Sequence, residues 1–262
     1  YMDMEKLGEK MATFKKAGVT PYMFKYGIVK RAKGRRRHIV LPEGDDDRIL
    51  TAASRLVEQE VVDLTILGVR ENVLTAGKRL GVNLEWEEIR IVDPVRSEYY
   101  QDYAATLQEL RKEKNVTIEM ARDLMTDVSY FGTMMVYKGH ADGMVSGAGQ
   151  TTQHTIRPAL QFVKTRPGVS VVSSVFFMCL PDRVSVFGDC AVNPDPTAEE
   201  VAEIAICSAE SAAMFGIEPR IAMLSYSSGT SGQGADVEKV RRATEIVRAR
   251  RPELKIAGPI QY

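Results

Sequence analysis

The sequence contains few of the residues that build metal sites and disulfide frameworks. Three of its 262 residues are histidines, and they are scattered along the chain: His38, His140 and His154. A histidine-based metal site is therefore not expected. The cysteines are also three, an odd number without C-x-x-C spacing: Cys179, Cys190 and Cys207. This pattern favours reduced cysteines that lie mostly in the core of a cytoplasmic protein.

Long apolar runs and an excess of one charge are absent as well. No apolar stretch approaches the roughly 20 residues that span a bilayer, and residues 1–6 lack the apolar segment of a signal peptide. Lysine plus arginine and aspartate plus glutamate each number 35, so the formal net charge is zero. No bulk attraction to nucleic acid or to a membrane surface is expected. The sequence therefore predicts an ordinary globular protein without a bulk preference for nucleic acid or for membranes.

Three common catalytic motifs are missing. No phosphate loop of the form Gly-x4-Gly-Lys-Ser/Thr is present, and the pair Gly232 and Gly234 lacks the third glycine of Gly-x-Gly-x-x-Gly. Nucleotide hydrolysis and nicotinamide binding are therefore poorly supported. No Gly-x-Ser-x-Gly elbow with a downstream aspartate and histidine occurs, and no histidine follows residue 154. This disfavours a serine hydrolase.

Short apolar strands alternate with amphipathic helices over the first part of the chain. The pattern predicts strands at 38–41, 63–68 and 89–92, and helices at 48–58, 71–80, 99–114, 118–125 and 130–138. An apolar run over 142–145 leads into a glycine-rich loop. Such alternation predicts the α/β class, with a parallel sheet covered on both faces. Ligands of these sheets bind beyond the carboxyl ends of the strands.

The pattern changes after Pro167-Gly168. A β-rich run over 169–178 and a second strand at 184–187 predict an antiparallel hairpin. Thr197 and Glu200 form a capping box that opens a helix to about residue 215. Further strands are expected at 220–224 and 254–257, with a helix at 236–250 between them. We therefore expect a lead-in or linker at 1–34, domain I at 35–166 and domain II at 167–262.

The best candidate for a ligand site is the junction 146–157. It combines Ser146-Gly-Ala-Gly149 with the hydroxyls of Thr151 and Thr152 and with Arg157. Glycines let backbone N–H groups approach a ligand, hydroxyls and arginine add donors, and a following helix adds its positive end. These features favour a phosphate cradle. The alternative is a purely structural role, in which glycine and threonine serve the geometry of a strand-to-helix turn.

Other polar groups carry a functional and a structural interpretation. The junction 225–241 resembles the first in its glycines and hydroxyls, which include Ser227, Ser228, Gly229 and Ser231. Arg111 is a possible phosphate donor or part of a solvated helix face. The acids 45–47 stand where a helix begins, which favours capping over metal binding. The run 35–37, three arginines, favours a solvated lead-in over anion binding.

Several longer motifs occur together and in order along the chain. The stretch 142–148 reads DGMVSGA, 155–161 reads TIRPALQ, and 189–194 reads DCAVNP. Further matching stretches lie at 23–24, 39–44, 167–170, 173–178, 224–227, 237–244 and 258–261. In these motifs the sequence resembles the phosphotransacetylase family (phosphate acetyl/butyryltransferases) over nearly its whole length. The approach at 20–24 is similar to that of long, multidomain members.

The resemblance implies reversible transfer of an acetyl group between CoA and inorganic phosphate: acetyl-CoA plus phosphate gives acetyl phosphate plus CoA. It implies two α/β/α domains with mostly parallel sheets, an inter-domain cleft, and a homodimer or higher homo-oligomer. CoA is a substrate, and no bound cofactor is implied. By this resemblance Arg111 and Arg157 match arginines linked to CoA or phosphate, and residues 146–152 and 227–231 match cleft-lining segments.

The resemblance also implies a departure from the family pattern. The family's domain continues past the Gly-Pro-Ile-Gln-Tyr motif that ends here at Tyr262, and the aspartate proposed as base lies in that continuation. We therefore assign no base among Asp142, Asp189 and Asp236, and expect residues 1–262 alone to be inactive. Two alternatives stay open: an acetyl-CoA-sensing domain of the malic-enzyme type, and a phosphate butyryltransferase that differs in its acyl pocket.

Overall fold

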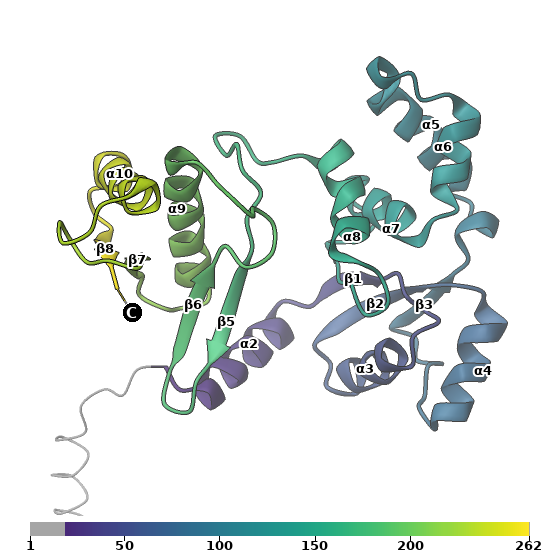
Figure 1. Ribbon diagram of the computed structural model, residues 1–262. Helices are drawn as coiled ribbons and strands as arrows, with labels where there is room; N and C mark the ends of the chain where they lie inside the picture. The colour runs from purple at the N-terminus through teal and green to yellow at the C-terminus, as the bar shows by residue number, and fades with distance from the viewer. Residues whose placement is uncertain (1–18, 262) are drawn as a thin grey trace, which may run out of the picture. The chain divides into compact units, whose positions relative to one another are not determined.

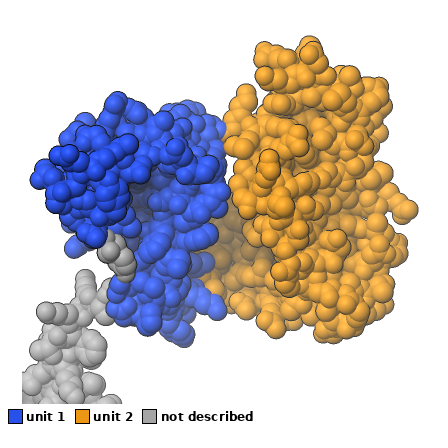
Figure 2. Space-filling view, viewed as in Figure 1, with its two compact units in different colours: residues 1–28, 165–262 blue, residues 29–164 orange. Residues whose placement is uncertain are grey.

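The computed structural model describes residues 19–261, which form two compact units. One unit consists of residues 29–164, and the other of residues 165–261 together with residues 19–28. Figure 1 labels the helices and strands, and Figure 2 colours the two units. Each unit has hydrophobic clusters of its own.

The unit formed by residues 29–164 is built on a four-stranded parallel sheet with strand order β3-β2-β1-β4. The strands are β1 (Arg37–Leu41), β2 (Val62–Leu67), β3 (Ile89–Val92) and β4 (Gly143–Met144). The helices are α3 (Asp47–Glu58), α4 (Arg70–Leu80), α5 (Tyr100–Leu110), α6 (Ile118–Met125), α7 (Val128–Tyr137) and α8 (Thr152–Pro158). The predicted α/β class and its parallel sheet are confirmed.

Helices cover both faces of this sheet. Neighbouring residues of a strand point to opposite faces, so each strand contributes side chains to both. On β1, Leu41 belongs to a hydrophobic cluster with Leu50 of α3. The adjacent Val40 belongs to a second cluster, with Tyr103 of α5 and Phe131 of α7. Each fully buried side chain of this size contributes about 1.5–3 kcal/mol to folding. The two clusters pack the helices against the two faces of the sheet.

The helix expected over residues 99–114 is shorter than predicted. α5 ends at Leu110, and a short 3-10 turn follows over Lys112–Lys114. Asn115 ends this turn in left-handed backbone with φ of 56°, a conformation that asparagine tolerates better than most residues. The prediction of one continuous helix to Lys114 is therefore wrong, and Arg111 stands at a helix end.

The second unit contains a β-hairpin and a pair of parallel strands. β5 (Val175–Cys179) and β6 (Val184–Gly188) pair antiparallel, which confirms the predicted hairpin. β7 (Arg220–Leu224) and β8 (Lys255–Ile260) pair parallel. The helices α9 (Ala198–Met214) and α10 (Ala235–Arg250) belong to this unit, and α2 (Pro21–Gly34) begins in it. The capping box at the start of α9, with Thr197 and Glu200, is present as expected.

The β-rich run after Gly168 is a strand only in its second half. The backbone N–H of Ser170 donates to the carboxylate of Glu203, and that of Ser174 donates to Asp189 at 2.8 Å. Side chains therefore satisfy backbone groups that a neighbouring strand would otherwise pair. For this reason the prediction of a strand over all of 169–178 is wrong, and β5 begins at Val175.

An aromatic cluster attaches the start of α2 to the second unit. The ring centroid of Phe24 lies 5.3 Å from that of Phe177 and 5.9 Å from that of Phe215, and the last two are 4.4 Å apart. Such pairs add about 0.5–1.5 kcal/mol beyond the area they bury. Phe24 is buried. This part of the expected lead-in is therefore packed into a folded unit.

The cysteines do not lie in the core. Cys179 is exposed at the end of β5, and Cys190 and Cys207 are half-buried. The thiol of Cys190 donates to the carbonyl oxygen of Phe187 at 3.0 Å, and the sulfur of Cys207 lies 3.9 Å from Arg166 Nη2. The expectation of mostly buried cysteines is wrong: none is fully buried, with Cys179 at the end of β5, Cys190 in the loop after β6 and Cys207 on α9. All three are free thiols.

Candidate functional site

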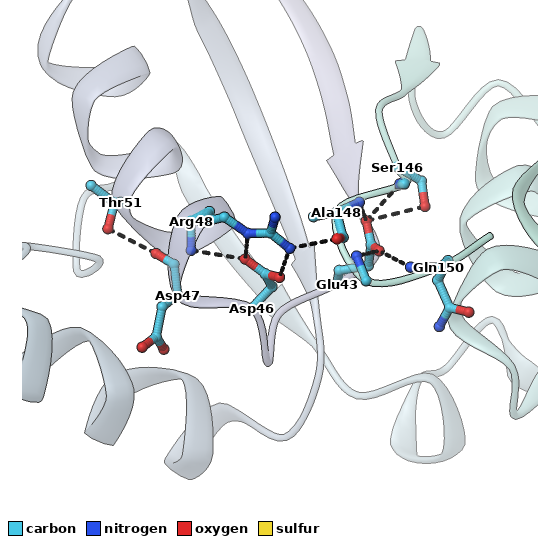
Figure 3. Close-up of polar contacts among 10 residues, drawn as sticks. Glu43, Asp46, Asp47, Arg48, Thr51, Ser146, Ala148 and Gln150 are labelled. Carbon is cyan, nitrogen blue, oxygen red and sulfur yellow. Dashed lines mark hydrogen bonds and ion pairs between the residues drawn. The ribbon is translucent and has the colours of Figure 1, made fainter. Parts of the chain in front are cut away.

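The glycine-rich loop 146–150 surrounds a carboxylate of the chain itself. Four successive backbone N–H groups, from Gly147 to Gln150, donate to Glu43 (Figure 3). Those of Gly147 and Ala148 reach Oε2 at 2.8 and 3.0 Å, and those of Gly149 and Gln150 reach Oε1 at 2.6 and 2.9 Å. The Ser146 hydroxyl also donates to Oε2, at 3.3 Å. The loop is thus a cradle for an anion, and the anion is Glu43.

The sheet topology brings Glu43 to this loop. β1 and β4 are parallel neighbours, with Val40 opposite Met144, so their carboxyl ends lie at the same edge. Glu43 follows β1 and the loop follows β4. Gly44 is required beside it, because a Cβ there would lie 2.4 Å from the carbonyl oxygen of Leu67. The turn after β1 therefore packs closely against the end of β2.

Glu43 is ionised in this cradle. Its side chain is 3% exposed, and this burial alone would raise the pKa of the carboxyl. The hydrogen bonds from the N–H groups of residues 147–150 outweigh burial and hold the pKa below its usual value. Backbone N–H groups stabilise the buried charge, and within residues 19–261 no oppositely charged side chain lies at hydrogen-bond distance from it.

Arg48 also holds the loop 146–150, because its side chain donates to one of the loop's carbonyl oxygens. Its Nη2 donates to the carbonyl oxygen of Ala148 and, at 2.6 Å, to Asp46 (Figure 3). Asp46 is the N-cap of α3 and accepts from the Arg48 N–H at 2.8 Å. The hydrogen bonds from Arg48 lower the pKa of Asp46 to about 2. The capping interpretation of the acids 45–47 is therefore confirmed.

The four predicted residues of this junction divide into two groups. Ser146 and Thr151 are engaged within the chain: the Thr151 hydroxyl caps α8 by accepting from the His154 N–H at 3.2 Å. Thr152 and Arg157 are exposed on α8. Within residues 19–261 the side chains of these two form no hydrogen bond or ion pair. Arg157 is thus a cation available to an external anion.

Arg111 is half-buried and does not lie on a solvated helix face. Its Nη1 donates to the carbonyl oxygen of Gln161 at 3.3 Å, and its Nε is buried without a partner among the described residues. The side chain of Gln161 accepts from the Tyr130 hydroxyl at 3.0 Å. Gln161 follows Arg157 by one helical turn. The structure thus brings Arg111 to the segment that carries Arg157, with one donor unused.

The four predicted residues of the second loop lie together in the other unit. The Ser227 and Ser231 hydroxyls are 2.9 Å apart, and that of Ser231 also donates to the carbonyl oxygen of Ser228 at 2.6 Å. The N–H of Gly229, whose φ is 58°, donates to the Pro259 carbonyl oxygen at 2.9 Å. These contacts order the loop before α10 and use most of its hydroxyls internally.

Two aspartates of the motifs, Asp142 and Asp189, are committed to hydrogen-bond partners. Asp142 accepts from the Arg37 side chain at 2.6 Å and from the His38 N–H at 3.0 Å, and these bonds lower its pKa. Arg37 is therefore paired and not an open anion site. Asp189 accepts six hydrogen bonds, from Ser174, Cys190, Val192 and Asn193. Asp236 lies 3.7 Å from Lys239.

Among residues 19–261, no group of three or more histidine, cysteine, aspartate or glutamate side chains is arranged to hold a metal ion. The helices of this part of the chain are also too short or too polar to cross a membrane. Sequence reasoning missed Glu43. The signal that identifies it is positional: an acid in a Pro-Glu-Gly turn at the carboxyl end of a strand that neighbours the glycine-rich loop.

Comparisons with known proteins agree with the sequence motifs. The profile of a family described as "Phosphate acetyl/butaryl transferase" matches residues 23–262. A phosphate acetyltransferase of Synechocystis is 57% identical over 261 residues, which cover 100% of this chain and 37% of the relative. One of Corynebacterium glutamicum is 51% identical, covering 92% of this chain and 72% of the relative. The chain thus spans little more than a third of the Synechocystis protein.

A solved structure gives the same answer for the fold. The crystal structure of a phosphotransacetylase from Streptococcus pyogenes superimposes with a TM-score of 0.87 at 42% sequence identity. The match covers 92% of this chain and 73% of that one. The described residues therefore share their fold with a phosphotransacetylase.

Proposed function

Because the chain belongs to the phosphate acetyl/butaryl transferase family, we propose that the protein is a phosphate acetyltransferase. It exchanges an acetyl group between CoA and inorganic phosphate. The observation that carries this proposal is Arg157, an exposed arginine with no partner in the described part of the chain, on the helix that follows a fixed loop. A guanidinium in this situation can form two parallel hydrogen bonds with a phosphate group.

The site residues follow from this arrangement. Arg157 and the Thr152 hydroxyl bind a phosphate-bearing substrate, and Arg111 offers its unpaired Nε to the same segment. In the second unit, the loop 227–231, with Ser227, Ser228, Gly229 and Ser231, is a separate candidate for substrate binding. Ser146 and Thr151 act through the loop geometry, since their hydroxyls are already engaged. Positioning of two bound reactants accounts for a large part of the rate enhancement of such transfers.

The proposed reaction needs a base and a site for negative charge. The CoA thiol loses its proton, and its sulfur attacks the carbonyl carbon of acetyl phosphate. The bond from that carbon to the phosphate oxygen then breaks, and phosphate leaves with the electron pair. Cationic and N–H donors stabilise charge on the carbonyl oxygen and on phosphate. Residence in the cytoplasm and assembly as a homodimer belong to the same proposal.

The assay that tests this function is performed on the full-length protein, not on residues 1–262 alone, and measures acetyl-CoA breakdown that depends on phosphate or arsenate. We expect turnover with acetyl-CoA, and competition with butyryl-CoA at equal concentrations to favour the acetyl substrate by about tenfold or more, as hydrophobic pockets discriminate between acyl lengths by this order. A preference for butyryl-CoA would make the protein a phosphate butyryltransferase. Binding of acetyl-CoA without turnover would make it a sensor and overturn the proposal.

We also propose that residues 1–262 by themselves do not catalyse transfer. The motif aspartates Asp142 and Asp189 hold their protons weakly, because hydrogen bonds lower their pKa values, and their oxygens are committed to neighbours. The expected result is CoA binding without release of free CoA thiol above the uncatalysed rate. Isothermal titration with CoA and a thiol-detection assay on the same sample measure the two properties. Turnover in that sample would contradict this prediction.

A further inference from the structure

Glu43 connects two turns that are far apart in the sequence and close at the edge of the sheet. Its turn follows β1, and the loop 146–150 follows the neighbouring strand β4. The loop has few other attachments to the sheet. The N–H of Val145 donates to the Val40 carbonyl oxygen at 3.0 Å, and Arg48 holds the carbonyl oxygen of Ala148. Four N–H groups in succession therefore depend on one side chain (Figure 3).

The loop leads directly into α8 and fixes where this helix starts, while His154 of α8 lies 2.9 Å from Asp127, the N-cap of α7. Gln150, whose N–H donates to Glu43, is followed by the N-cap Thr151 and by the first helical residue, Thr152. Arg157 lies in the last turn of the same short helix. A change in the backbone at 147–150 changes the direction in which α8 starts and therefore where Arg157 lies.

The same contacts decide what the loop can bind. A buried carboxylate occupies the four N–H groups, so a substrate phosphate at that point would have to displace it or face its negative charge. Charges of the same sign at one site destabilise each other strongly. The glycine-rich loop therefore does not offer these N–H groups to a substrate, and substrate anions are left to the side chains that it positions.

We propose that Glu43 is a positioning residue for the proposed acetyltransferase site: its carboxylate fixes loop 146–150 and thereby places Arg157 and Thr152 for the phosphate-bearing substrate. This inference rests on the proposed function for its kinetic readout. Its structural part, the dependence of the loop on Glu43, can be measured without any turnover.

The test compares Glu43→Ala, Glu43→Gln and Glu43→Asp with the wild-type protein. Alanine removes the acceptor, glutamine replaces one acceptor oxygen with an NH₂ donor, and aspartate keeps a carboxylate one methylene shorter. Glu203→Gln is the matched control, because Glu203 also accepts backbone N–H bonds, from Ser170 and Val171, but supports a different loop. Hydrogen–deuterium exchange reports on the N–H groups of residues 147–150, and steady-state kinetics report on CoA.

We expect Glu43→Ala and Glu43→Gln to lose exchange protection at residues 147–150 and to raise KM for CoA about 10- to 100-fold, since loss of a charge-assisted contact between Arg157 and a substrate phosphate weakens binding by this order. Glu43→Asp should show a smaller change of the same kind, and Glu203→Gln neither change. Formate added to Glu43→Ala should restore both protection and KM, because it supplies a carboxylate to the vacated cradle.

Protected N–H groups and a wild-type KM in Glu43→Ala or Glu43→Gln would overturn the inference. Equal losses of stability and activity in Glu43→Gln and Glu203→Gln, without an effect of formate on Glu43→Ala, would overturn it as well, because Glu43 would then be a stabilising residue only. If the full-length wild-type protein has no turnover, the proposed function fails, whereas exchange and its restoration by formate still decide the role of Glu43 in the loop.

Discussion

Arg157→Ala is expected to lower kcat/KM for acetyl transfer by about 100-fold, as loss of a charge-assisted contact that strengthens in the transition state typically does. The melting temperature should stay within about 1 °C of the wild-type value, because exposed residues without partners contribute little to stability. Arg157 forms no contact whose loss would leave another described residue unpaired. Steady-state kinetics and thermal denaturation of the same preparation measure both quantities.

Two further variants define the cause of this loss. Arg157→Lys keeps the charge but not the planar pair of donors, so its activity should lie between those of the wild type and Arg157→Ala. Arg122 is the matched control, an exposed arginine in the last turn of α6 that donates to Gln101 at 3.2 Å. Arg122→Ala should leave kcat/KM unchanged. Wild-type activity in Arg157→Ala would remove Arg157 from the substrate site.

Asp189→Ala is expected to destabilise the protein by about 3 kcal/mol, because it leaves several backbone N–H groups without an acceptor. The corresponding fall in melting temperature is about 6–12 °C. Asp189 accepts from the N–H and hydroxyl of Ser174 at 2.8 and 2.6 Å and from the N–H of Asn193 at 2.6 Å. Thermal denaturation at neutral pH measures the effect.

The pH dependence of the protein's stability separates the effect of the charge of Asp189 from the effect of its shape. Burial raises the pKa of Asp189, but the hydrogen bonds from Ser174 and Asn193 outweigh it and hold the pKa well below its usual value. The ionised group therefore stabilises the fold fully above about pH 4 and less as the pH falls towards the folded-state pKa. The stability difference between wild type and Asp189→Asn should narrow as the pH is lowered through this range.

Asp182→Asn is the control for this measurement. Asp182 is an exposed aspartate in the turn between β5 and β6 and pairs with Arg183 at 3.2 Å. Its replacement should give nearly the same stability as the wild type at every pH, since exposed ion pairs contribute about 0–1 kcal/mol. A difference for Asp189→Asn that stays constant from pH 7 to pH 3 would show that the carboxylate charge does not stabilise the loop.

The parts of the fold that the sequence predicts correctly are those encoded by local patterns. The apolar run that forms β1 and the capping box of Thr197 and Glu200 each depend on residues within a few positions of one another. The strands of the parallel sheet follow from such runs and from their alternation with helices. The same reasoning failed at the start of the run 169–178, because the side chains of Glu203 and Asp189 take the backbone N–H groups there.

The candidate site was predictable in its location but not in its bonding. Glycines, hydroxyls and an arginine mark the junction 146–157, and the carboxyl-end rule for parallel sheets places it correctly. That Glu43 would occupy the loop depends on a pairing of residues about 100 positions apart, which no local pattern reports. No local pattern reports the contact between Arg111 and Gln161 either. Arg111 reaches Gln161 because its helix ends earlier than the sequence predicts.

The aromatic cluster of Phe24, Phe177 and Phe215 has a consequence for how the chain is made on the ribosome. Residues 29–164 have their own sheet and two hydrophobic clusters, so all of their partners emerge together. Phe24 is synthesised before them, yet its ring partners emerge only after they are complete. At translation rates of about 5–20 residues per second, its apolar face waits roughly 10–40 s for Phe215. During that interval Phe24 lacks the two aromatic rings against which it is packed in the folded unit.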